Sequence, residues 1–333
     1  MKKKVLLFLL LLIVPINIKA YSDKIIPGGN TIGIKVSSNG VMVVGFYKVD
    51  GSYNKGDPEL KIGDYITKID GSSVSTVEEL VDIVSKHSIE EEMSITFLRN
   101  KKEYVTSIPL FLMDGKYKTG LYVKDSITGI GTLSYIDPES NVYGALGHEI
   151  LESNSKVMLD ITGGSIFKNV VTSIDRSIDG EPGSKNAKFY NNVNYGNVVE
   201  NTKYGIYGIL NTTSLNTEAL PIKKISEVNL GKAYLRTVVK GEKINDYEIN
   251  ITDINKNSKL KSITFEITDP KLLDEAGGIV QGMSGSPIIQ DGYLVGAVTH
   301  VIVDDVKKGY AISIITMLDE GDKMLSKIND ENH

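Results

Sequence analysis

The sequence predicts a mainly β protein with two domains, and three observations indicate this class. The 333 residues exceed the size at which one hydrophobic core usually stops growing. Hydrophobic residues make up 41% and charged residues 24%, which is typical of soluble globular chains. Short Val- and Ile-rich runs separated by Gly, Asn and Asp fill most of the chain and predict strands. Helical periodicity is confined to residues 75–87 and a stretch near 313–327.

The first twenty residues, MKKKVLLFLLLLIVPINIKA, are a predicted export signal. Lysines precede an apolar run from Val5 to Ile16. This run of about twelve residues is shorter than the roughly twenty that a membrane helix needs, which favours cleavage. Pro15 interrupts the run and the segment lacks an A-x-A box, so an uncleaved membrane anchor remains an alternative. In either case, residues 1–20 predict export across the cytoplasmic membrane.

The composition excludes several kinds of site. Cysteine is absent, which removes disulfides, thiolate metal sites and a cysteine nucleophile. The 4 histidines show no H-E-x-x-H or comparable spacing. The formal net charge is −5, with no long run of one sign. We therefore expect no cofactor, no metal ion and no nucleic-acid partner.

Residues 29–112 form the first expected domain. The run TIGIKVSSNGVMVVGFYKVDG contains two strands around a turn at Asn39-Gly40, and KIGDYITKIDGSSV adds a second strand pair. The run STVEELVDIVSKH has apolar residues at helical spacing, and Ser75 with Glu78 matches a capping box. Two further strands follow. The order predicts a compact α+β module.

Residues 118–330 form the second expected domain. Short strands recur at a spacing of about ten residues, with GIGTLSYIDP, KVMLDITGG and GYLVGAVTHVIV as examples. This spacing favours a β-sandwich or a pair of β-barrels.

The run QGMSGSP, residues 281–287, holds the candidate nucleophile. A serine needs a base to take its proton and amide donors aimed at the developing oxyanion. With Gly282 free to adopt unusual dihedral angles, the N–H groups of Gly282 and Ser284 can supply those donors. Ser284 is therefore a candidate catalytic serine.

Two histidines compete for the role of base. His148 follows a glycine in YGALGHEI, whereas His300 lies on an alternating strand and is better interpreted as a buried or pocket-lining residue. For the carboxylate that orients the base, Asp269 in ITDPKLL is preferred and Asp160 in KVMLDITGG is the alternative. Glu149 is disfavoured because neighbouring residues on a strand point to opposite faces.

The first domain resembles a PDZ domain. Thr31, Ile32, Gly33 and Ile34 resemble the Φ-G-Φ loop that binds a peptide carboxylate, LKIGDYITKIDG resembles the G-D-x-I-x-x-I-N/D-G segment of bacterial PDZ domains, and 75–87 resembles the helix beside the groove. The resemblance implies that a peptide adds as a strand beside that loop.

The second domain resembles the SpoIVB peptidase family of endospore-forming Firmicutes. The matching runs are GALGHEI, GEPGSKNAKF and FEITDPKLLDEAGGIVQGMSGSPIIQDGYLVGAVTHVIVDD. The resemblance implies a chymotrypsin-like double β-barrel with His148, Asp269 and Ser284 as its triad. Unlike most chymotrypsin-like enzymes, this chain has the aspartate only fifteen positions before the serine.

The resemblance also implies a biological role. We expect an exported serine endopeptidase that cleaves its own chain and a membrane-embedded regulator of an intramembrane protease, which in turn processes a late sigma factor. Its expected location is the space between the forespore and mother-cell membranes. The alternatives are an HtrA-like quality-control protease, which usually carries its PDZ domain after the peptidase, and a catalytically inactive PDZ adaptor.

Overall fold

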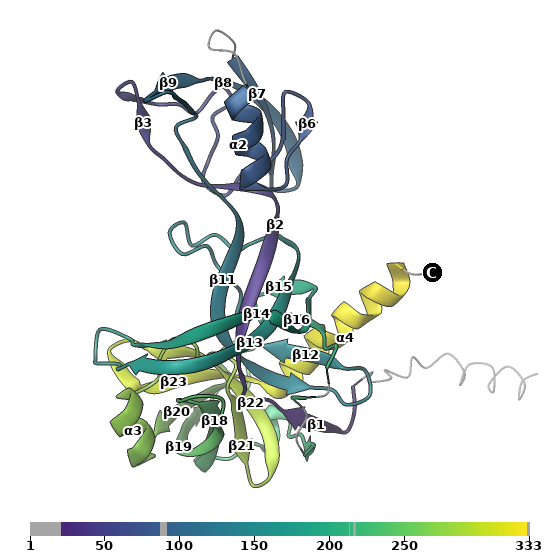
Figure 1. The fold of residues 1–333 in the computed structure, drawn as a ribbon. Coiled ribbons are helices and arrows are strands. Elements are labelled where there is room, and N and C mark those ends of the chain that lie inside the picture. Colours follow the sequence, from purple (N-terminus) through teal and green to yellow (C-terminus); the bar gives the residue numbers. More distant parts are fainter. Residues whose placement is uncertain (1–20, 87–91, 213, 216–217, 332–333) are drawn as a thin grey trace, which may run out of the picture.

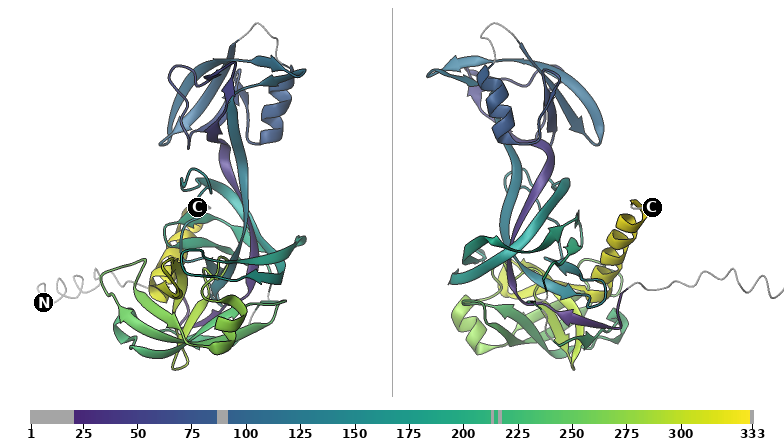
Figure 2. Two further views of the ribbon diagram at one scale, coloured as in Figure 1. Left: turned by 90° about the vertical axis from the view of Figure 1, so that its left-hand side faces the viewer. Right: turned by 45° about the vertical axis from the view of Figure 1, so that its right-hand side comes forward.

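A computed structural model describes residues 21–86, 92–212, 214–215 and 218–331. The predicted signal segment 1–20 lies outside these residues. A small domain and a larger body are connected by two long strands, β2 (Thr31–Phe46) and β11 (Leu121–Ile136) (Figure 1). Both strands stay continuous between the two bodies when the molecule is turned (Figure 2).

The small domain has its own apolar core. Its elements are β3 (Lys48–Val49), β4 (Ser52–Tyr53), β5 (Tyr65–Ile69), β6 (Ser72–Ser73), α2 (Val77–Lys86), β7 (Glu92–Arg99), β8 (Lys102–Pro109), β9 (Phe111–Met113) and β10 (Lys116–Lys118). The upper half of β2 pairs with β5 and β11, and β5 continues to β7 and β8. The fully buried Ile66, Ile95 and Phe97 pack under the helix residues Leu80 and Val84.

The small domain is an insertion in a hairpin of the larger body. The first half of β2 pairs with the second half of β11 from Ser37–Ser126 to Thr31–Thr132. Strand β1 (Lys24–Pro27) also pairs with β11. The pairing thus places residues 24–38 in the sheet of the larger body, although residues 29–38 belong to the expected first domain, 29–112.

The larger body consists of a half-barrel and a closed barrel. The half-barrel adds β12 (Val142–Ala145), β13 (Ile161–Asp175), β14 (Ser184–Val198), β15 (Glu200–Thr202), β16 (Gly205–Ile209) and β17 (Leu220–Pro221) to β1, β2 and β11. The closed barrel contains β18 (Gly231–Val238), β19 (Ile244–Ile254), β20 (Ile263–Ile267), β21 (Pro287–Gln290), β22 (Tyr293–Ile302) and β23 (Asp305–Ser313). The prediction of a mainly β chain whose second part has two barrel-like halves is confirmed.

The helices agree only in part with the sequence-based expectation. Helix α2 is found, but its capping box joins Thr76 and Glu79 instead of Ser75 and Glu78: the Glu79 carboxylate accepts the N–H of Thr76, and Thr76 Oγ1 accepts the N–H of Glu79. The late helix is α4 (Ile314–Glu331). A short helix that the sequence analysis did not predict, α3 (Pro270–Ala276), follows Asp269. Among the described residues, no helix is long and apolar enough to cross a membrane.

Candidate active site

The serine turn lies where the two barrels meet. Gly282 and Gly285 both have φ +93°, in the left-handed region that favours glycine. A Cβ on Gly285 would come within 2.1 Å of Thr132 O and 2.5 Å of Leu146 N, both in the half-barrel. The turn therefore approaches the half-barrel backbone closely only because position 285 has no side chain, and this contact places Ser284 at the barrel interface.

His148 is brought to the same interface by the end of β12. Leu146 and Gly147 each have φ 70°. A Cβ on Gly147 would contact Thr299 and Ile312 of the closed barrel at 3.1 and 3.2 Å. The chain thus turns sharply against β22 and β23, and the next side chain is that of His148.

Ser284, His148 and His300 line one cavity of about 540 Å³. The rings of His148 and His300 lie 5.1 Å apart between centroids. Ser284 Oγ donates a hydrogen bond to Thr299 O at 3.0 Å. Within the described residues no hydrogen bond joins Ser284 to His148. The prediction that His300 lines a pocket is confirmed, although its side chain is exposed.

A backbone carbonyl fixes the tautomer of His148. Its Nδ1 lies 2.7 Å from Glu149 O. Because a carbonyl oxygen only accepts, Nδ1 carries the proton and Nε2 is left as the basic nitrogen. Burial lowers the pKa of His148, an effect opposed by the hydrogen bond and the charge of Glu149. Although the side chain of His300 is exposed, partial desolvation of its ring and the nearby His148 lower its pKa to about 4. Both imidazoles are therefore neutral near pH 7.

Two amides of the serine turn are available for an oxyanion. Met283, Gly285 and Ser286 donate their N–H groups to Val280, Val298 and Met283. In the described part of the chain, the N–H groups of Gly282 and Ser284 have no acceptor. These are the two donors that the sequence analysis named.

A buried lysine lies behind the turn. The Nζ of Lys185 is 3.1 Å from Thr31 Oγ1, 3.0 Å from Thr237 Oγ1 and 3.5 Å from Thr132 Oγ1. Thr132 Oγ1 in turn donates to Gly282 O at 2.7 Å. Burial lowers the pKa of the Lys185 amine to about 7. Sequence reasoning missed this residue, because a single lysine on an otherwise polar strand carries no signal of burial.

Asp269 is not in the cavity. It is the N-cap of α3, and its carboxylate accepts the N–H groups of Lys271 at 2.9 Å, Leu272 at 3.0 Å and Glu248 at 3.2 Å. The structure brings His148 and Ser284 together but does not bring Asp269 to them. The sequence carried a signal for this cap, namely Asp followed by Pro at the first helical position.

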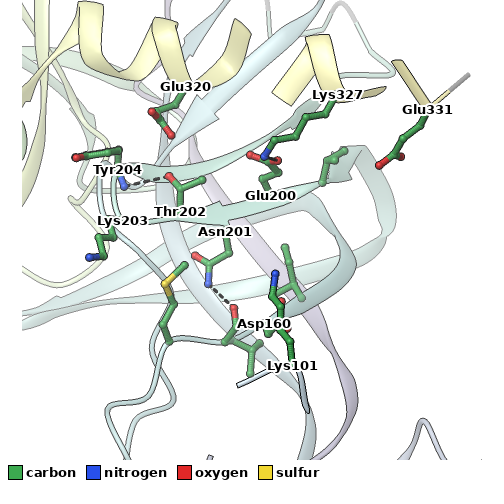
Figure 3. A pocket seen from close by; sticks show the side chains of 14 residues that line it. Lys101, Asp160, Glu200, Asn201, Thr202, Lys203, Tyr204, Glu320, Lys327 and Glu331 are labelled. Atoms are coloured by element: carbon green, nitrogen blue, oxygen red, sulfur yellow. Dashed lines mark hydrogen bonds and ion pairs between the residues drawn. The ribbon is translucent and has the colours of Figure 1, made fainter. Parts of the chain in front are cut away.

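The alternative carboxylate, Asp160, lies elsewhere as well. It lines a larger cavity of about 920 Å³ together with Lys101, Asn201 and residues of α4 (Figure 3). Its backbone N–H donates to Tyr65 OH at 2.9 Å. This larger cavity contains neither Ser284 nor His148. The candidate active site is therefore the smaller cavity, which contains Ser284 and His148, and not the larger one.

The expected carboxylate-binding loop at Thr31–Ile34 is corrected by the structure. These residues lie inside β2, with β11 on one side and β13 on the other. A Cβ on Gly33 would overlap the Phe167 ring at 2.2 Å. A strand paired on both edges cannot accept a peptide as a further strand.

The free strand edge belongs to β11 instead. Among the described residues, β11 pairs with β2 along one edge, whereas its other edge is paired only from Leu133 onward, by β12. The N–H of Val77, at the start of α2, donates to the Asp125 carboxylate at 2.8 Å, so the helix begins beside this edge. A helix beside a free edge is the arrangement that peptide binding by strand addition needs.

The segment just before β11 is a better candidate for the carboxylate loop. Gly120 has φ +80°, and the N–H of Leu121 donates to Thr119 Oγ1 at 3.3 Å. Asn54 Nδ2 donates to Thr119 O at 3.1 Å and holds the loop. The signal was present in the sequence as KTGLYV, a second glycine between a polar and an apolar residue before a strand.

Comparison with known families gives the class and then the family. A profile of the PDZ domain matches residues 31–110, and a profile of SpoIVB peptidase S55 matches residues 115–318. The molecule is thus a peptidase with a PDZ domain, and its catalytic class is that of the serine peptidases. The chain belongs to the SpoIVB peptidase S55 family.

Solved structures give more distant similarities. The PDZ domain of an SdrC-like protein from Listeria monocytogenes is 26% identical, with coverage of 26% of this chain and 90% of that chain and a TM-score of 0.23. The Rv3671c protease from M. tuberculosis in its active form is 15% identical, with coverage of 60% and 74% and a TM-score of 0.33. The HtrA-type protease AlgW with a decapeptide is 9% identical, with coverage of 62% and 55% and a TM-score of 0.35. A search among curated proteins found no match.

Proposed function

We propose that this protein is a serine endopeptidase in which Ser284 is the nucleophile and His148 is the general base. One observation carries the proposal: Ser284 and His148 line one cavity, beside two backbone N–H groups that have no acceptor among the described residues. A nucleophile, a base and oxyanion donors in one cleft are the parts that acyl transfer requires.

The chemistry follows from this placement. After the Ser284 hydroxyl turns from Thr299 O, His148 Nε2 accepts its proton as Oγ attacks the scissile carbonyl carbon. The N–H groups of Gly282 and Ser284 stabilise the oxyanion, and His148 then protonates the leaving amine. Water attacks the resulting acyl ester, with His148 again as the base, and Ser284 is regenerated.

The base is oriented by the Glu149 carbonyl in this conformation. A hydrogen bond from Nδ1 to a carbonyl oxygen fixes the ring and the tautomer, as an aspartate does in other serine peptidases. The role of Asp269 as a third triad member stays a prediction, and its three backbone hydrogen bonds support a capping role.

The substrates are proteins or peptides, as both domains imply. At a finer level we propose self-cleavage, cleavage of a membrane-associated regulator of an intramembrane protease, and a role in sporulation signalling outside the cytosol. The family name and the predicted export segment support these proposals. A quality-control role remains the competing enzyme function.

A fluorophosphonate probe tests the enzyme directly against the adaptor alternative. The purified protein should be labelled and should hydrolyse an unstructured protein such as casein, whereas Ser284→Ala should do neither while giving the same circular dichroism spectrum. If casein is cleaved equally by Ser284→Ala, the nucleophile lies elsewhere. If the wild-type protein neither labels nor cleaves, the adaptor function is favoured.

A further inference from the structure

One strand edge connects the candidate peptide-binding loop with the candidate active site. Residues Ile127, Gly129 and Ile130 of β11 line the cavity that contains Ser284 and His148. Nine residues before Ile130, the same strand begins at Leu121, directly after the Thr119–Leu121 loop. The edge between them has no strand partner in the part of the chain that the structure describes.

The backbone groups of this edge point toward the cleft. The N–H of Thr132 donates to Ser284 O at 2.9 Å, and its C=O accepts the N–H of Leu146 at 3.3 Å, so both face away from β2. Backbone groups alternate in direction along a strand. Those of Ile130, Thr128 and Ser126 therefore also face away from β2 and lie at the free edge.

Hydrogen bonds also show which backbone groups face outward at the other end of the edge. The C=O of Gly120 accepts the N–H of Tyr47 at 2.9 Å, so it faces β2 and the backbone groups of Leu121 face outward. The register between β2 and β11 shifts between Tyr122 and Val123 and again between Lys124 and Ser126, where Asp125 lies opposite the four β2 residues 38–41. The C=O of Asp125 accepts a hydrogen bond from Ser38 Oγ at 3.1 Å and therefore faces β2, which agrees with outward backbone groups at Ser126. The two stretches of the edge, before and after Asp125, each follow their own alternation.

We propose that a single extended substrate segment adds to β11 along its whole free edge, so that the enzyme measures its cleavage site from the C-terminus of the substrate. The inference rests on the proposed peptidase function. The terminal carboxylate would be held at the Thr119–Leu121 loop, where the N–H of Leu121 would exchange its 3.3 Å contact with Thr119 Oγ1 for the carboxylate. The segment would run antiparallel to β11 toward Ser284.

The length of β11 between the loop and the cavity sets the distance from the substrate C-terminus to the cleaved bond. Leu121 to Ile130 spans ten residues of β11. An added strand matches its partner at about 3.3 Å per residue, so the scissile bond lies about ten residues before the substrate C-terminus. The irregular pairing around Asp125 changes this by about one residue. Binding of the carboxylate raises the effective concentration of that one peptide bond in the cleft.

The test uses the full chain and two peptide libraries. Both contain unstructured 24-residue peptides with mixed interior positions, one with a free C-terminal acid and the other with an amide. Mass spectrometry at low conversion gives the length of the C-terminal fragments. We expect fragments of about ten residues to dominate in the acid library and to lose that preference in the amide library.

A matched pair of variants assigns the preference to the loop. Gly120→Val should reduce the ratio of kcat/KM for acid peptides to kcat/KM for amide peptides at least about tenfold, because the added side chain displaces the loop that holds the carboxylate. Gly115→Val, which alters the same kind of positive-φ glycine in the β9–β10 turn with no atom within 4 Å of the added Cβ, should keep the preference.

N-methylation of the peptide tests the edge without altering the protein. Methyl groups on alternate residues that face β11 should abolish the preference, and methyl groups on the other alternate set should not. Equal fragment distributions in the acid and amide libraries would overturn the inference while leaving the peptidase intact. Absence of cleavage in both libraries together with absence of probe labelling would instead overturn the proposed function, and the inference with it.

Discussion

At the scale of single residues, the proposed function assigns the chemistry to the side chains of Ser284 and His148. Ser284→Ala should lower kcat/KM by at least about a thousandfold, because the turn keeps its shape but loses the nucleophile. His148→Ala should be comparably inactive, since members of a catalytic unit fail together. His300→Ala should keep measurable activity. Hydrolysis of a fluorogenic peptide checks all three variants, and a reversed order of the two histidines would contradict the choice of base.

The pH dependence of activity follows from the burial of His148. The base must be neutral, and burial lowers its pKa below 6.5, so it stays neutral in mild acid. We expect the acid limb of kcat/KM to have its midpoint below pH 6.5. Glu149→Gln should move the midpoint further down, because the charge of Glu149 raises the pKa of His148. A midpoint above pH 6.5 would indicate that another group titrates.

Lys185 predicts a pH-dependent stability. Its amine has a pKa of about 7 in the folded state and 10.5 as its ordinary value. Below pH 7 both states are charged, and the burial cost is complete. Between pH 7 and 10.5 the Lys185 amine is charged in the unfolded chain and neutral in the folded protein. The free energy of unfolding therefore rises by about 1.4 kcal/mol for each unit by which the pH increases.

Denaturant titrations at several pH values check this. Lys185→Met should remove that slope, and its free energy of unfolding should exceed the wild-type value most clearly below pH 7. Lys188→Met, at an exposed position on the same strand, should leave the slope unchanged. An unaltered slope in Lys185→Met would show that the amine is hydrated.

At the scale of elements, variants of Asp269 distinguish a helix N-cap from a triad member. As the N-cap of α3, Asp269→Ala should cost about 1 kcal/mol of stability, and Asp269→Asn much less, because asparagine caps helices as well as aspartate does. If the residue only caps, Asp269→Asn should retain near wild-type kcat/KM. A loss of about a thousandfold or more with unchanged thermal stability would restore the triad assignment.

At the scale of the whole molecule, the insertion of the small domain into the β2–β11 hairpin can be tested by excising that domain. Replacing residues 38–125 by Asn-Gly joins Ser37 to Ser126, which are paired in the β2–β11 hairpin, through a two-residue turn. The product should fold and react with a fluorophosphonate probe. Removal of residues 1–112, which would suit a PDZ domain placed wholly before the peptidase, should not fold, because it deletes β1 and β2. Fluorophosphonate labelling is measured for both products. Labelling of the 1–112 deletion, but not of the product that lacks residues 38–125, would contradict the insertion.

Local sequence patterns determined much of this protein. Alternating Val and Ile runs, Gly-Asp turns and one amphipathic stretch specify the strands and α2, because periodicity of 2 or 3.6 is a property of adjacent residues. The run QGMSGSP specifies a turn with unusual dihedral angles. In GALGH, the glycine marks a turn directly before His148. The β-rich class and the unusual backbone of Gly282 could therefore be predicted before the fold was known, and Ser284 and His148 could be named as candidates.

Only the tertiary structure decided which strand neighbours which, since pairing is a relation between residues far apart in the chain. Thr31–Ile34 has the local pattern of a carboxylate loop, yet pairing with β13 closes that edge and leaves β11 free. Asp269 is the triad aspartate that the family resemblance implies, yet the start of α3 uses its carboxylate. Lys185 is polar in sequence but is enclosed by threonines from three strands, because burial depends on what packs around a residue and not on its neighbours in the chain.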